Sequence, residues 1–108
     1  MSAPGGGDPD GAGFTVLMVA RVPAPVREAF DRYEAQALAL LSDHGGCLER
    51  RLAGRDGGLK VHVVWFPDGA AFDAYRGDSR RAAITPDLRT LVVDVEIHEV
   101  RDLPVPTS

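Results

Sequence analysis

The chain has 108 residues, of which 44% are hydrophobic and 26% are charged, and its net charge is -4 at pH 7. This length provides one domain, and the acidic balance argues against nucleic acid as a partner. Cys47 is the only cysteine, which excludes an internal disulfide and any paired-cysteine metal or redox motif and suits a cytoplasmic protein. No apolar run approaches the roughly 20 residues that cross a bilayer, so no membrane partner is expected.

The first residues are rich in Gly, Pro and Asp, and they have neither the basic start nor the apolar stretch of a signal peptide. This composition predicts a flexible tail over residues 1–13. A folded domain is expected over residues 14–101, and residues 102–108 are expected to form a second tail.

The first element expected is a strand from Phe14 to Val22, which is apolar on both faces and is followed by prolines that end it. An amphipathic helix of about five turns comes next, because apolar residues recur at steps of three and four. Its buried stripe comprises Val26, Phe30, Tyr33, Ala37, Leu38 and Leu41. Glu34 is placed among the polar residues between them. Gly45 provides the left-handed stop, and His44 is expected to complement the helix dipole.

A hairpin is expected next, with strands from Cys47 to Ala53 and from Leu59 to Phe66 around a glycine-rich turn. Asp68 is placed to cap a helix over residues 69–76. A second short helix is expected over residues 79–84, before a proline.

The last strand, from Leu91 to Glu99, has an apolar residue at every second position. Its apolar face is expected to pack beneath the helices and comprises Leu91, Val93, Val95 and Ile97. Its other face comprises Val92, Asp94, Glu96 and His98.

The order strand, helix, strand, strand, helix, strand predicts an α+β fold, a ferredoxin-like βαββαβ sandwich whose antiparallel sheet has the order 4-1-3-2. Helices cover only one face of such a sheet, yet the first and third strands carry apolar residues on both. Monomers rarely expose apolar patches larger than a few hundred Å². A second copy is therefore expected to cover the open face, which makes the protein a homodimer.

The segment from His62 to Tyr75, HVVWFPDGAAFDAY, followed by Asp78 and Ser79, resembles the passage from third strand to second helix in the dimeric α/β-barrel superfamily. Within that superfamily the chain is most similar to the uncharacterised DUF1330 group, which is related to the antibiotic biosynthesis monooxygenases. The resemblance covers roughly residues 14–100 and implies a ferredoxin-like fold that forms a dimeric α/β barrel. It does not fix a reaction, because one fold hosts many functions.

Three residues expected near the same edge of the sheet, on its open face, form the candidate catalytic group, His62, Asp94 and Arg21. An imidazole that a carboxylate orients can transfer protons, and an arginine can stabilise the oxyanion that results. The alternative is a cross-strand ion pair between Arg21 and Asp94, with His62 as a structural neighbour. A shift of one residue in strand register would reverse the faces on which these side chains lie.

Aromatic residues between the sheet and the helices are the candidates for substrate binding, namely Trp65, Phe66, Tyr33 and Tyr75. Packing of the core is the alternative role for each. A metal site built from His62, His98, Asp94 and Glu96 is disfavoured. At about 3.3 Å per strand residue, its two histidines are expected to lie more than about 10 Å apart.

These features predict a protein that binds a small organic molecule and acts on an aromatic or polyketide-like substrate without a cofactor, as a monooxygenase, isomerase or cyclase. Heme degradation is disfavoured, because relatives with that activity use an asparagine and this chain has none. The alternative is a non-catalytic module for ligand binding or dimerisation. A cavity that reaches Tyr33 or Tyr75 together with a titratable group would favour the enzyme, whereas a packed interior would favour the module.

Overall fold

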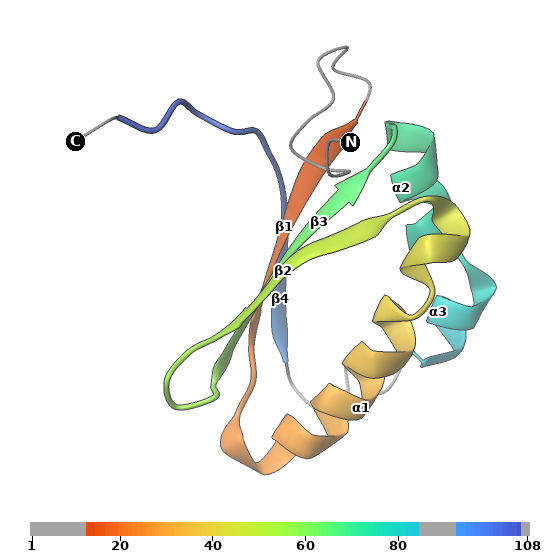
Figure 1. The fold of residues 1–108 in the computed structure, drawn as a ribbon. Coiled ribbons are helices and arrows are strands. Elements are labelled where there is room, and N and C mark those ends of the chain that lie inside the picture. The colour runs from red at the N-terminus through yellow and green to blue at the C-terminus, as the bar shows by residue number, and fades with distance from the viewer. Residues whose placement is uncertain (1–12, 85–92, 107–108) are drawn as a thin grey trace.

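The computed structural model describes residues 13–84 and 93–106. Its elements in chain order are β1 (Phe14–Arg21), η1 (Ala24–Val26), α1 (Arg27–Leu38), η2 (Leu41–His44), β2 (Cys47–Ala53), β3 (Leu59–Phe66), α2 (Gly69–Arg76), α3 (Ser79–Ile84) and β4 (Asp94–Val100). The strands form one antiparallel sheet in the order β2-β3-β1-β4, and the helices lie on one side of it (Figure 1). The predicted ferredoxin-like fold and strand order are confirmed.

Local signals set most of the element boundaries. β2, β3, α2 and α3 have the bounds that the sequence predicts. Asp68 caps α2 as expected, because its Oδ1 accepts a hydrogen bond of 2.8 Å from the backbone N–H of Ala71. Residues 1–12 of the first predicted tail and residues 107–108 of the second lie outside the described residues, as do Leu91 and Val92 at the start of the predicted last strand.

The first helix is shorter than predicted. α1 ends at Leu38, and the chain continues through the separate 3₁₀ turn η2 to Gly45, whose φ of 73° is the left-handed stop expected there. The tighter turn brings Leu41 into the core, where 4% of it is exposed. His44 has a partner of its own, because its Nε2 lies 2.7 Å from Oδ2 of Asp78. Its side chain therefore connects η2 to the start of α3.

Strand register decides which side chains face the helices. Met18 at the centre of β1 is opposite His62 on β3 and Ile97 on β4, so these three residues share a face. Alternate residues of β1 and β3 on this face, including Val16, Ala20 and Val64, are buried beneath the helices. The buried side chains form two clusters. One contains Val16, Leu41, Val64, Phe66 and Phe72, and the other contains Ala20, Val22, Phe30, Tyr33 and Ala37.

The other face of the sheet carries apolar residues that no described element covers (Figure 1). Leu17, Val61, Val63 and Trp65 are partly exposed there. β4 is exposed along its whole length, including Val95 and Ile97 on the helix side. These two residues are 39% and 49% exposed, whereas Val93 packs against the cluster that contains Ala20. The predicted apolar face therefore lies on the helix side, but the helices cover it only in part. No helix in the described ranges has the length and hydrophobicity to span a bilayer.

Candidate functional site

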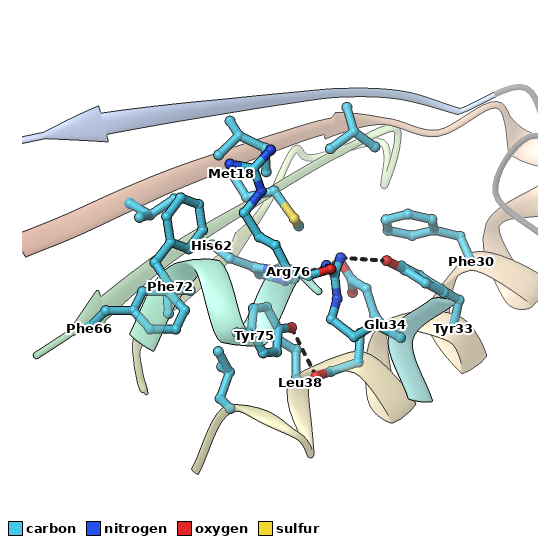
Figure 2. A pocket seen from close by; sticks show the side chains of 17 residues that line it. Met18, Phe30, Tyr33, Glu34, Leu38, His62, Phe66, Phe72, Tyr75 and Arg76 are labelled. Atoms are coloured by element: carbon cyan, nitrogen blue, oxygen red, sulfur yellow. Dashed lines mark hydrogen bonds and ion pairs between the residues drawn. The ribbon is translucent and has the colours of Figure 1, made fainter. Parts of the chain in front are cut away.

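A cavity of about 370 Å³ lies between the sheet and the helices, where the two core clusters meet. Figure 2 shows side chains converging on it from the strands on one side and from the helices on the other. Its walls are mainly apolar and aromatic, with Met18, Phe66, Phe72 and Tyr75 among them. This volume is near the lower end of the range of about 300 to 1,000 Å³ that is typical of small-molecule sites.

Two fully buried titratable side chains form part of the cavity wall. His62 and Glu34 are each only 1% exposed. His62 lies near the middle of β3, where it pairs with Met18 on the helix-covered face of the sheet, and this position directs its ring toward α1. Glu34 lies on α1 one turn after Phe30 and one turn before Ala37 and Leu38, which places it on the buried side of that helix. Two buried titratable groups therefore meet in a mainly apolar pocket.

The hydrogen bonding of this pair is incomplete. Oε1 of Glu34 accepts a hydrogen bond of 3.0 Å from Nη2 of Arg51, a β2 residue opposite His62 in the sheet. Oε2 of Glu34 lies 3.1 Å from Nε2 of His62, but the two groups are not aligned for a hydrogen bond. Among the described residues, Oε2 of Glu34 and both ring nitrogens of His62 have no hydrogen-bond partner. Buried polar atoms without partners are costly, and a ligand in the cavity could supply the missing bonds.

Burial shifts the ionisation of both groups. The pKa of His62 is lowered to about 4. Burial is the main cause, and the nearby positive charges of Arg51 and Lys60 contribute to the same shift. His62 is therefore neutral at pH 7 and offers one N–H donor and one acceptor nitrogen. Burial also raises the pKa of Glu34, although the hydrogen bond and charge of Arg51 act against this shift. A carboxyl group with a raised pKa is suited to exchanging protons with a ligand near neutral pH.

Two tyrosines line the cavity as the sequence predicts. The hydroxyl of Tyr75 donates a hydrogen bond of 2.9 Å to the backbone oxygen of Ala37, and burial raises the pKa of this phenol. The hydroxyl of Tyr33 accepts a bond of 3.3 Å from Nη2 of Arg81 (Figure 2). Phe66 also lines the cavity and is 1% exposed. Trp65 does not, because it lies on the opposite face of β3, and its predicted place in the pocket wall is wrong.

The predicted catalytic group is not assembled in the structure. Arg21 and Asp94 are opposite each other on β1 and β4, on the open face of the sheet, whereas His62 faces the helices. The prediction that the three share a face is wrong, because both faces of β1 and β3 are apolar and hydrophobicity does not show which one is covered. The alternative prediction, a cross-strand ion pair between Arg21 and Asp94, is also wrong, because Arg21 pairs with Glu96 instead. Nη1 of Arg21 bonds Oε2 of Glu96 at 2.6 Å, and both side chains are about half exposed.

Glu34 and Arg51 are site residues that the sequence pattern does not single out. The charge of Glu34 predicts a place on the polar side of the helix, although it follows Phe30 by four residues and precedes Ala37 by three. That spacing puts it on the buried stripe and was the signal available in the sequence. Arg51 carries no such signal, because its role depends on the pairing of β2 with β3.

The residues considered for a metal site are also separated. His62 is opposite Met18, and His98 is opposite Leu17, so the two rings lie on opposite faces of the sheet. Nε2 of His98 contacts Oε1 of Glu96 at 3.1 Å on the exposed side. Within the described ranges, no group of three or more His, Cys, Asp or Glu residues is placed to hold an ion.

Solved structures of other proteins share this fold. PA3566 from Pseudomonas aeruginosa has a TM-score of 0.73 and 19% identity over 86% of this chain and 96% of its own. SnoaB, a cofactor-independent oxygenase from Streptomyces nogalater, has a TM-score of 0.68 and 18% identity over 85% of this chain and 96% of its own. A candidate antibiotic biosynthesis monooxygenase from Nitrosomonas europaea has a TM-score of 0.68 and 13% identity over 83% of this chain and 91% of its own.

These likenesses are low in sequence identity and show the fold alone. No family model and no curated protein matches the sequence. The similarity to the DUF1330 group therefore stays a prediction.

Proposed function

We propose that this protein binds a small aromatic or polyketide-like molecule in the cavity and removes a proton from it, as a cofactor-independent monooxygenase. The observation that carries the proposal is the pair of buried titratable side chains, Glu34 and His62, which line an apolar cavity with their hydrogen bonding incomplete. The cavity also reaches Tyr33 and Tyr75. An apolar pocket with a few convergent polar groups is the usual form of a small-molecule site.

The proposed chemistry begins with a phenol or enol bound against the apolar wall. Oε2 of Glu34 accepts the acidic proton, and the N–H of neutral His62 donates a hydrogen bond to the oxyanion that forms. The electron-rich ring then reduces O₂. One oxygen atom enters the ring as a carbonyl and the other leaves as water, so the substrate supplies the electrons and no external reductant is consumed. Glu34 thus takes the place of Asp94 as the carboxylate partner of His62.

The structural neighbours support an oxygenase role but not a particular substrate. SnoaB, which shares this fold, is a cofactor-independent oxygenase. Isomerisation or cyclisation would begin with the same proton removal and differ only in the fate of the carbanion. A non-catalytic binding module would use the same cavity without transferring a proton.

We further propose that the protein is a homodimer in which a second copy covers the open face of the sheet. The support is the row of partly exposed apolar residues Leu17, Val61, Val63 and Trp65 on that face. Beyond β4, Leu103 and Val105 are 67% and 85% exposed. Burial of such surface contributes roughly 25 cal/mol per Å² before the costs of association. Sedimentation that shows a stable monomer at micromolar concentration would contradict the dimer.

The test of the proposed function is oxygen consumption with anthrone, an enolisable tricyclic ketone, as substrate. We expect Glu34→Gln to lower the rate roughly 100-fold or more, the range typical of losing a general base. Glu28→Gln is the matched control, because Glu28 lies on the same helix with a side chain that is 93% exposed. Binding of anthrone with no oxygen uptake above the uncatalysed rate would reject the oxygenase and favour the binding module.

A further inference from the structure

The mouth of the cavity carries a guanidinium group that the proposed proton transfer does not use. Arg76 ends α2, and although much of it is exposed, its side chain lines the cavity. Figure 2 shows it extending from the helix toward the strands. Its guanidinium carbon lies 5.1 Å from the centre of the Phe72 ring, which is part of the cavity wall. Stacking on this ring holds the cation at the cavity mouth.

The charge of Arg76 is not neutralised by a described carboxylate, since no ion pair joins it to an acidic side chain in residues 13–84 and 93–106. Asp78, two residues after it, is engaged by His44 at 2.7 Å and by Arg80 at 2.7 Å. Within the cavity wall as described, Glu34 is the one carboxylate, and it is bound to Arg51. An aromatic ring attracts a guanidinium without occupying its N–H donors, so these remain able to bind an anion.

The rest of the cavity suits an apolar ring. The centroid of the Phe66 ring lies 5.1 Å from that of Phe72 and 5.6 Å from that of Tyr75. Val95 and Ile97 complete the rim on the side of β4. A molecule bound here would have its ring against this wall and one end at Arg76.

We propose that the pocket selects aromatic acids, with Arg76 binding the carboxylate or other anionic group of the ligand at the mouth. This inference rests on the proposed function, because it assumes that the cavity is the ligand site. The overall charge of the protein is negative, so selectivity for an anion must come from a local group of this kind. Arg76 is a specificity-determining residue in this scheme, and the proton transfer takes place deeper in the cavity.

The test compares a naphthoate with the neutral naphthamide of the same substitution pattern, which has almost the same shape. Binding is measured by isothermal titration at low ionic strength, and the methyl resonance of Met18 reports that the cavity is the site. We expect the naphthoate to bind roughly fivefold more tightly, as for a partly exposed ion pair. Arg76→Gln should remove this preference and leave the affinity for the amide unchanged, whereas Arg76→Lys should keep part of it.

Arg55→Gln is the matched control, because Arg55 lies in the exposed turn between β2 and β3 and its loss changes the net charge equally. This variant should keep the full preference. Equal affinities of the native protein for the two probes, or a preference that survives in Arg76→Gln, would overturn the inference while leaving the proposed small-molecule site intact. If neither probe shifts the Met18 resonance, both the inference and the proposed site fail.

Discussion

Replacement of His62 by Gln tests whether the imidazole is buried and uncharged in the native protein. In an unfolded chain a histidine has a pKa near 6.5, whereas burial lowers the pKa of His62 to about 4. Below pH 6.5 the unfolded state therefore binds a proton that the folded state binds only near pH 4. A group with a lowered folded-state pKa of this kind makes the protein less stable as the pH falls from about 6.5 to 4.

The expected size of the effect follows from the two pKa values. Between pH 7 and pH 5, His62 should reduce the free energy of unfolding by about 2 kcal/mol, and the loss should level off below pH 4. The raised pKa of Glu34 acts in the opposite direction, because the folded state then holds its proton more tightly than the unfolded state above pH 4.5. The comparison of native protein with His62→Gln at each pH isolates the contribution of the histidine to first order.

The assay is urea denaturation at steps of half a pH unit from pH 7.5 to pH 4.5, with unfolding monitored by circular dichroism. We expect the stability difference between native protein and His62→Gln to change by about 2.5 kcal/mol across this range. His98→Gln serves as control, since that side chain is 52% exposed and its removal should keep the acid-side loss of the native protein. A stability difference for His62→Gln that stays constant from pH 7 to 5 would refute the argument for a desolvated imidazole.

Three other substitutions test separate parts of the structure. Arg51→Met removes the donor to buried Glu34 and should cost about 1 to 3 kcal/mol at pH 8 but less at pH 5, where the carboxyl group can protonate; a pH-independent loss in urea denaturation would contradict this. Asp68→Ala removes the cap of α2 and should cost about 1 kcal/mol in the same assay, whereas exposed Asp73→Ala should be nearly neutral. Val63→Glu places a charge on the open face, so the sedimentation coefficient should fall to that of a monomer while the circular dichroism spectrum stays native.

The candidate site was only partly predictable, and the residues show why. His62, Tyr33, Tyr75 and Phe66 were identified because each lies at a regular position on an element whose type the sequence indicates. Glu34, the partner of His62, was not identified, because a charged residue is expected to face water. Helical spacing alone determines which residues face the core. A charged residue at such a position can be buried when a partner compensates its charge.

The elements and their order follow from local sequence signals, because periodicity, the Asp68 cap and the Gly45 stop act over a few residues. Which face of the sheet is covered depends instead on how the helices pack against it in three dimensions. β1 and β3 are apolar on both faces, so the burial of apolar side chains would favour either face equally. The side of the sheet on which the helices pack determines which face is buried. That choice brings His62 to Glu34 and moves Arg21 and Asp94 to the other side, since neighbouring strand residues point in opposite directions.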